Sequence, residues 1–265
     1  MVSDPADGTL NMALDEALMR RAGRTGEAVF RVYGWSAPTL SLGRNQRARD
    51  CYNLDAAAGR GVGFVRRPTG GRALLHHREV TYSVTMPLAS ASATGRGGGG
   101  RVGRGGREGS AYDFINDILI AALGRMGVVA GRAPEPVSLQ PGLRPCFDVP
   151  AEHEIVVGGR KLVGSAQWRK GGALLQHGSI LVRDDQALIE ELLKAALPAP
   201  TMAAATLHDV LGRDPTIDEV AEELRRSLAD ATQAPPRPLQ LDDAANANLS
   251  ALRASYADDA WTWRR

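Results

Sequence analysis

Residues 154–182 read EIVVGGRKLVGSAQWRKGGALLQHGSILV and decide the fold. Apolar residues on both sides of Gly158-Gly159 give the pattern of two antiparallel strands joined by a two-residue turn. The second strand continues from Gly164 to Trp168, and residues 173–182 read as a third strand. This stretch therefore predicts a β-sheet built on a glycine hairpin.

Segments outside this stretch supply further strands and the helices. The stretches 28–33, 39–42, 63–66 and 79–86 have strand composition, whereas 10–22 and 111–126 carry apolar residues at helical spacing. From Asp184 the character changes to three helical segments, 185–197, 216–231 and 242–256, separated by prolines. We expect an α+β fold with a mixed sheet backed by helices: a catalytic domain over 1–200, and a helical C-terminal extension over 201–265 packed on it.

Composition excludes several classes of protein. The 265 residues are 43% hydrophobic with a net charge of +2, which fits a folded globular chain and disfavours a dedicated nucleic-acid binder. Two cysteines make no disulfide framework, and no cluster has zinc-site spacing, so no metal is expected. The start lacks a signal-peptide pattern, and no apolar run approaches the ~18 residues of a membrane span. We expect a soluble, cytoplasmic protein with no membrane contact.

Residues 95–109, GRGGGGRVGRGGREG, contain nine glycines and four arginines. Such a composition cannot build a packed core, so we predict a mobile surface loop.

A glycine turn flanked by arginines is the first candidate site. The run is Arg66-Arg67-Pro68-Thr69-Gly70-Gly71-Arg72, and His76 follows it. Glycines let a backbone approach a ligand closely, and guanidinium groups suit a phosphate or a carbonyl oxygen. His76 and His177 lie in or beside strands near this turn and could also touch a ligand. The alternative interpretation is an ordinary turn with solvated arginines.

Lys161 is the second candidate. Only three of the 32 basic residues are lysines, so a lysine within a strand is conspicuous. It shares its face with Val163, and its strand runs on into the small residues Ser165 and Ala166, which leave room for a ligand. A partly desolvated lysine there would have a lowered pKa or act as a fixed positive charge. The alternative is a lysine that extends to water.

Cys146, in the Pro-bounded loop PCFDVP, is the third candidate. A nucleophilic cysteine needs thiolate character, which a nearby cation supplies. The alternative is an inert, partly buried thiol, and this interpretation fits Cys51 better still.

Taken together, RRPTGGRALLHH, EVTYSV and GGRKLVGSAQWR…LLQHGSILV resemble the lipoate–protein ligase, octanoyltransferase and biotin–protein ligase superfamily. NMALDEALM and YGWSAPTLSLGRNQ are similar to its opening helix and strands. The resemblance implies a tunnel for a fatty acyl chain. It also implies that Lys161 contacts the acyl carbonyl, and that Arg66, Arg67, Gly70, Gly71 and Arg72 frame the same pocket.

Members of this superfamily follow two chemistries. PCFDVPAEHEI, with its cysteine fifteen residues before Lys161, and TGGR at 69–72 resemble the LipM-type octanoyltransferases, which use a cysteine and no cofactor. The alternative is a lipoate ligase that needs ATP and Mg²⁺, with Cys146 a bystander. A third interpretation is a non-catalytic acyl- or biotin-binding regulator.

The resemblance implies a mechanism in two steps. Cys146 takes octanoate from octanoyl-acyl carrier protein, and Lys161 lowers the pKa of the thiol and contacts the carbonyl oxygen. The acceptor is a lysine on a lipoyl-type carrier, either the glycine cleavage H protein or the lipoyl domain of a 2-oxo acid dehydrogenase. Val163, Leu74 and Leu75 are candidate tunnel walls, with Gly70, Gly71, Ser165 and Ala166 beside the acyl head. We expect a monomer.

Overall fold

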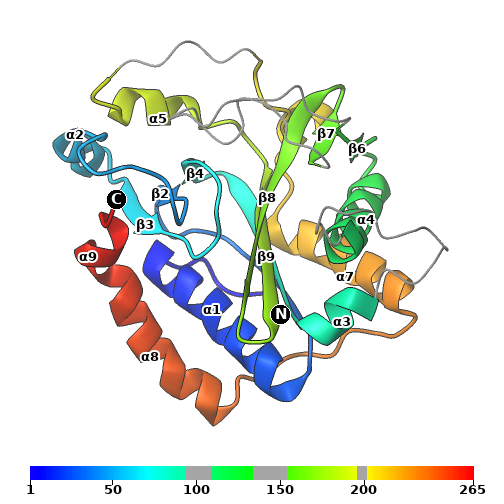
Figure 1. Ribbon diagram of the computed structural model, residues 1–265. Coiled ribbons are helices and arrows are strands. Elements are labelled where there is room, and N and C mark those ends of the chain that lie inside the picture. The colour runs from blue at the N-terminus through cyan, green and yellow to red at the C-terminus, as the bar shows by residue number, and fades with distance from the viewer. Residues whose placement is uncertain (94–108, 134–153, 196–201) are drawn as a thin grey trace.

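A six-stranded sheet forms the centre of the computed structural model, which describes residues 1–93, 109–133, 154–195 and 202–265 (Figure 1). Its strand order is β1-β5-β9-β8-β7-β6, and all neighbouring strands are antiparallel. The strands are β1 (Val29–Tyr33), β5 (Glu79–Pro87), β9 (Ala173–Leu181), β8 (Arg160–Lys170), β7 (Ile155–Val157) and β6 (Gly131–Arg132). Gly158 and Gly159 both have positive φ, which is the conformation of a type I′ hairpin turn.

A three-stranded sheet lies beside it, in the order β3-β2-β4. The central strand β2 (Thr39–Leu42) runs parallel to β3 (Gly63–Arg66) and antiparallel to β4 (Leu74–His76). The glycine turn connects β3 to β4. This small sheet therefore holds the turn in front of the large one.

Helices cover both faces of the large sheet (Figure 1). On one side, α1 (Gly8–Thr25) packs against β5 and β9, and α8 (Asp243–Ala257) packs on α1. On the other, α4 (Gly109–Arg125) and α7 (Ile217–Thr232) pack together. The remaining helices are α2 (Leu54–Gly59), α3 (Leu88–Ala93), α5 (Ala187–Leu192), α6 (Leu207–Leu211) and α9 (Asp259–Thr262).

Local sequence explains where the main helices begin and end. The Asp7 carboxylate accepts from the backbone N–H groups of Thr9 and Leu10 at the start of α1, and Gly26 ends that helix in the left-handed region at φ 75°. Thr216 and Glu219 form a reciprocal capping box at the start of α7. None of the helices in the described ranges has the length and hydropathy to cross a membrane.

Strand alternation decides what faces the site. In β5 the even-numbered residues Val80, Tyr82, Val84 and Met86 pack into the core beneath α4 and α7. The odd-numbered residues Thr81 and Ser83 are buried on the opposite face and carry hydroxyl groups. The large sheet therefore has one apolar face and one polar face, and the polar face looks toward the small sheet and α1.

The predicted α+β class, with a mixed sheet backed by helices and helices at the C-terminal end, is confirmed. Within the predicted region 185–197, the helix α5 spans only Ala187–Leu192. The short elements β4, β6, α2, α3, α6 and α9 were not predicted. The expected loop 95–109 lies almost wholly outside the described residues, as does the expected domain boundary at residue 200. That boundary stays a prediction.

Candidate active site

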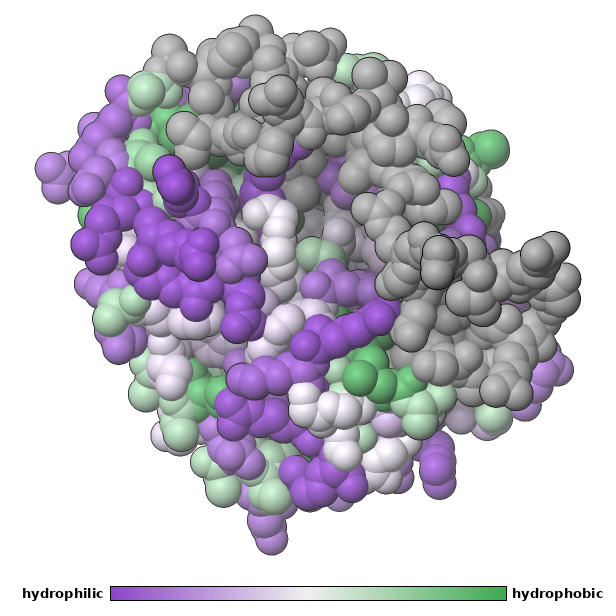
Figure 2. All heavy atoms as spheres, in the orientation of Figure 1, coloured by the Kyte–Doolittle hydropathy of each residue, from purple (hydrophilic) through white to green (hydrophobic). Residues whose placement is uncertain are grey.

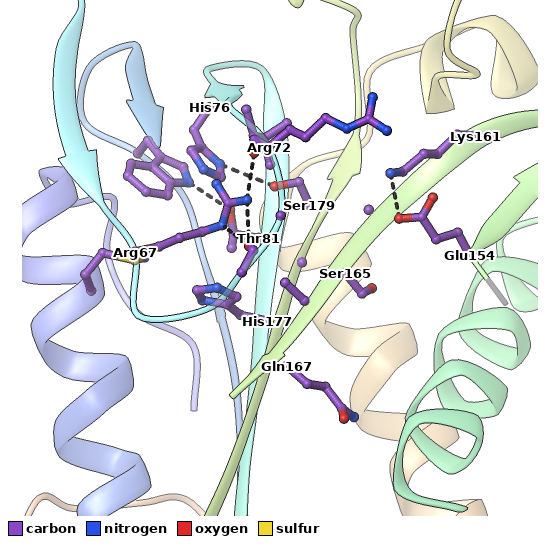
Figure 3. Close-up of a pocket in the computed structure, with 18 of the residues that line it drawn as sticks. Arg67, Arg72, His76, Thr81, Glu154, Lys161, Ser165, Gln167, His177 and Ser179 are labelled. Carbon is purple, nitrogen blue, oxygen red and sulfur yellow. Dashed lines mark hydrogen bonds and ion pairs between the residues drawn. The ribbon is translucent and has the colours of Figure 1, made fainter. Parts of the chain in front are cut away.

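A cavity of about 360 Å³ lies between the two sheets. Lys161 and Glu154 line one side, and Arg67, His76 and His177 line the other (Figure 3). The glycine turn and α1 complete its wall. The lining residues are Met12, Tyr33, Trp35, Arg67, Gly70, Gly71, Arg72, Leu74, His76, Thr81, Glu154, Lys161, Gly164, Ser165, Ala166, Gln167, His177, Gly178 and Ser179.

Lys161 is a buried cation on β8. Its Nζ donates to Glu154 Oε1 at 2.6 Å, and both residues are at most 5% exposed. In a medium of low dielectric constant the two groups attract each other strongly, so the contact fixes the Lys161 side chain on the cavity wall. The pair can therefore supply a fixed ammonium group to an anion or a carbonyl oxygen in the cavity.

Arg67 shapes the glycine turn from inside. Its guanidinium donates to Gly70 O at 2.9 and 3.1 Å and to Arg72 O at 2.7 Å. A further donor binds Ser41 O and Oγ on β2 at 2.9 and 3.0 Å. Gly71 has φ 96°, a conformation that favours glycine. Arg67 thus fixes the turn to the small sheet and leaves the turn's backbone lining the cavity.

His76 belongs to a hydrogen-bonded network at the end of β4. Its Nδ1 lies 2.7 Å from Glu79 Oε1, and its Nε2 lies 2.8 Å from Ser41 Oγ. Ser179 Oγ and Thr81 Oγ1 also donate to Glu79 Oε1, at 2.7 and 2.6 Å. The Trp35 ring stacks on the imidazole at 3.9 Å between centroids. These contacts fix the position of the imidazole on the cavity wall.

His177, on β9, joins three elements. Its Nδ1 lies 3.0 Å from Asp15 Oδ2 of α1, and its Nε2 lies 2.7 Å from Thr69 Oγ1 of the glycine turn. Burial lowers the pKa of His177 from 6.5, so the imidazole is neutral. In that state Nδ1–H donates to the carboxylate, and Nε2 accepts from the threonine hydroxyl. The pKa of Asp15 is also lowered; burial opposes ionisation, but the hydrogen bond from His177 and the charge of Arg31 outweigh it.

Small residues let β8 and β9 approach each other closely beside the cavity. A Cβ atom on Gly178 would lie 2.4 Å from Gly164 O and 2.9 Å from Ser165 Oγ. Ser165 Oγ is 2.6 Å from Tyr82 Oη. Because the strands come so close here, a larger side chain at Gly178 would push them apart and change the cavity.

The structure brings most of the predicted site residues together. Those that line the cavity are Arg67, Gly70, Gly71, Arg72, His76, Lys161, Ser165, Ala166 and His177. Of the predicted tunnel walls, Leu74 lines it, whereas Leu75 and Val163 pack into hydrophobic clusters. Cys146 lies outside the described residues, so its place at the cavity stays a prediction.

Arg66 does not reach the cavity. Its guanidinium is fully buried and donates to the backbone carbonyls of Gly43, Gln46 and Thr262 at 2.6–2.9 Å. Strand alternation gives the reason, because adjacent residues of one chain point to opposite sides. Arg67 takes the side of the cavity, and Arg66 takes the side of the C-terminal segment.

Glu154 is the main site residue that the sequence did not single out. Val156 pairs with Lys161 across the hairpin, but the register then shifts so that Ile155 pairs with Val163. Because of this irregularity, the strand pairing at the glycine hairpin does not predict where the Glu154 side chain lies. A signal was nevertheless available, because a lysine predicted to be buried requires a carboxylate nearby.

The family model of the lipoyl protein ligase A/B catalytic domain matches residues 7–229. The chain therefore belongs to the lipoyl protein ligase A/B catalytic domain family.

Within that family the chain is similar to proteins named octanoyltransferase LipM. The protein of that name from Kyrpidia tusciae is 38% identical over 96% of this chain and 94% of its own length. The one from Staphylococcus aureus is 34% identical over 98% and 95%.

Solved structures of the family share the fold. A lipoate-protein ligase A bound with ATP aligns with a TM-score of 0.78 at 21% identity, over 99% of this chain and 97% of that one. The Thermoplasma acidophilum protein Ta0514 with bound lipoic acid aligns at 0.77 and 21% identity, over 99% and 98%.

Proposed function

We propose that this protein is an octanoyltransferase of lipoate biosynthesis. The observation that carries the proposal is the similarity, over nearly the whole of both chains, to proteins named octanoyltransferase LipM. A buried ammonium group beside a cavity rimmed by glycine backbone fits the handling of an acyl carbonyl. The donor is octanoyl-acyl carrier protein, and the acceptor is a lysine of the glycine cleavage H protein or of a lipoyl domain.

The reaction uses Cys146 as its nucleophile. The thiolate attacks the octanoyl thioester, a new C–S bond forms to Cys146, and the carrier thiol leaves with a proton. The lysine ε-amine of the acceptor then attacks the acyl-enzyme, so that an amide forms and the Cys146 thiol is regenerated. Exchange of a thioester for an amide is downhill, so this sequence needs neither ATP nor a metal.

Lys161 has two tasks in this proposal. Its ammonium group favours the thiolate form of Cys146, and it stabilises the negative charge that develops on the carbonyl oxygen. Glu154, at 2.6 Å, orients the ammonium group. The imidazoles of His76 and His177 line the opposite wall with their nitrogens engaged in hydrogen bonds, which suits them to hold the shape of the cavity.

Intact-mass measurement tests the proposal directly. The wild-type protein incubated with octanoyl-acyl carrier protein, without ATP, should gain one octanoyl group. Cys146→Ala should gain none, whereas Cys51→Ala, which removes the partly exposed cysteine beside α2, should react like wild type. An adduct that survives Cys146→Ala, or its absence from wild type, would sink the proposal.

The same samples distinguish the proposed transferase from the alternative, an ATP-dependent ligase. ATP-dependent lipoylation of a carrier domain that is indifferent to Cys146 would establish a ligase in place of the transferase. We propose that the protein acts as a monomer in the cytoplasm; sedimentation of the enzyme alone tests the first part.

A further inference from the structure

Four basic side chains near the cavity are linked by contacts with shared neighbours and are here called the basic rim: Arg44, Arg49, Lys170 and Arg264. The Arg44 guanidinium lies 5.1 Å from the centre of the Trp168 ring, and Lys170 Nζ lies 5.3 Å from the same centre. Arg264 donates to the backbone oxygen of Arg44, and Arg49 Nε donates to Trp263 O at 2.9 Å. The rim therefore joins the end of β2, the end of β8 and the C-terminal segment.

The basic rim is attached to the wall of the cavity. The Arg44 N–H donates to Thr69 O, in the glycine turn, at 2.8 Å. Gly43 touches the same turn so closely that a Cβ atom there would lie 1.9 Å from Gly71 O. Trp168 follows Gln167, which lines the cavity. A macromolecule seated on the rim would therefore lie next to the cavity. Figure 2 shows hydrophilic residues gathered over β2, β3 and the C-terminal segment.

In the described part of the chain, the basic rim has no ion pair with an acidic side chain. Across the described ranges, no carboxylate side chain lies within 4.0 Å of these four cations, whereas Arg213 and Arg225, for example, each pair with a glutamate. Arg264 Nε is buried without a hydrogen-bond partner. Burial, and then the like charges of Arg44 and Arg265, lower the pKa of Arg264. Aromatic rings and backbone oxygens hold these side chains in place, as the Trp261 ring does for Arg264 at 4.1 Å, and a partner with acidic groups would reduce the repulsion between their charges.

The chemistry of the two carriers decides which one fits, and this step rests on the proposed function. The acceptor presents a lysine ammonium group, which a cationic rim repels as it approaches the cavity. The donor presents a neutral thioester and has no such penalty. We propose that the basic rim is the docking surface for an acidic face of the carrier protein that delivers the octanoyl group.

Charge reversal tests the docking surface. Arg44→Glu combined with Lys170→Glu should raise the KM for octanoyl-acyl carrier protein about tenfold or more, with kcat of the acylation step little changed. Added salt should weaken the wild-type reaction and leave the variant insensitive or improved. Arg237→Glu reverses the charge of an exposed arginine in a second hollow, lined by residues of β1 and α7, and is the matched control that should match wild type.

Small acyl donors distinguish a loss of protein docking from general damage to the active site. Octanoyl-pantetheine carries the same thioester without protein or phosphate, so the variant should react with it as fast as wild type does. An equal loss with octanoyl-pantetheine would overturn the proposal, as would an unchanged KM for the protein donor. An equal loss with octanoyl-4′-phosphopantetheine would do the same, by assigning the rim to the phosphate.

The second half-reaction completes the test. Transfer from preformed acyl-enzyme to the acceptor should be equal in variant and wild type, and a selective loss there would assign the rim to the acceptor and overturn the proposal. Failure of the proposed function is a different result. In that case wild type would not be acylated by the carrier at all, whatever residues occupy the rim.

Discussion

Each of the two sheets buries a cation close to the cavity, and the two cations have different partners. Arg66, at the end of the small sheet, donates to three backbone carbonyls that come from residues 43, 46 and 262. Lys161, on the large sheet, donates to the carboxylate of Glu154 and lines the cavity. Both side chains are at most 2% exposed.

The hydrogen-bond acceptors distinguish a cation that stabilises the fold, Arg66, from one that can act on a substrate, Lys161. Backbone carbonyls do not titrate, and a planar guanidinium binds several of them at fixed angles, so Arg66 ties distant segments together. Burial and neighbouring arginines lower its pKa to about 10, which leaves it charged at neutral pH. The Lys161 ammonium group, which donates to a carboxylate oxygen of Glu154, is instead a concentrated charge on the wall of the cavity.

Lys161→Met gives the largest expected effect and tests the chemical side of this comparison. Acyl-enzyme formation should fall roughly 100- to 1000-fold, because the charge next to the developing oxyanion is lost. Rapid-quench mass spectrometry of the acylation step measures it. The pH at which acylation proceeds should rise, since the thiol loses the cation that favours its thiolate form.

Stability needs a separate control, because Lys161→Met leaves Glu154 buried without its ammonium partner. The double variant Lys161→Met/Glu154→Gln removes that charge and should regain most of the lost stability while staying slow. If the double variant instead regained activity, the ion pair would be structural, and the contrast with Arg66 would disappear.

The sequence predicted the fold well where the signals are local. Gly158-Gly159 between apolar runs requires a hairpin, and the spacing of Leu10, Leu14 and Leu18 requires a helix, so both were found. The strand β4 was missed because its three residues follow a glycine turn and offer too short a pattern to read. The short helices α6 and α9 were missed for the same reason.

The site was predictable only in part, because contacts between distant residues set it. Scarcity and alternation pointed to Lys161, which does line the cavity. No local pattern shows that His177 meets Asp15, 162 residues earlier, or that Arg66 binds Thr262 O, 196 residues later. Arg66 and Arg67 are adjacent arginines before the same glycine turn, so the sequence does not distinguish them. Only the tertiary structure shows that their roles differ.

Arg66→Met should have the next largest effect, on stability and not on chemistry. It removes the guanidinium donor from Thr262 O and Gln46 O and one of the two donors from Gly43 O, which also accepts from the Gln46 N–H, at ~1 kcal/mol each, so the free energy of unfolding should fall by about 3 kcal/mol. For a chain of this size the Tm should drop by roughly 6–12 °C. Urea unfolding measures the loss, and acylation per folded molecule should stay near the wild-type rate.

Arg66→Lys is the matched control, since it keeps the charge but cannot reach three carbonyls in one plane. It should recover less than half of the lost stability. A normal Tm combined with a raised KM for the acyl donor would reverse the assignment, and would return Arg66 to the substrate-binding role that the sequence predicted.

His177 lies where the two sheets meet, and its replacement should have the smallest effect. His177→Asn breaks the contact with Thr69 or with Asp15, which costs about 1 kcal/mol at neutral pH. This variant is informative because it changes how the free energy of unfolding depends on pH. Because burial lowers the pKa of His177 from 6.5, the unfolded chain takes up a proton as the pH falls below 6.5 while the folded chain resists it.

Wild-type stability should therefore decline as the pH falls below 6.5, and His177→Asn should decline less steeply, because its amide does not titrate. Urea midpoints measured from neutral pH downward show the two slopes, with His208→Asn as the control for the loss of a histidine that is only partly buried and contacts Asp214. Parallel stability curves for wild type and variant would mean that the contacts of His177 with Thr69 and Asp15 persist when His177 is protonated. Converging curves would mean that a neutral imidazole is what holds the glycine turn of the small sheet against the large one.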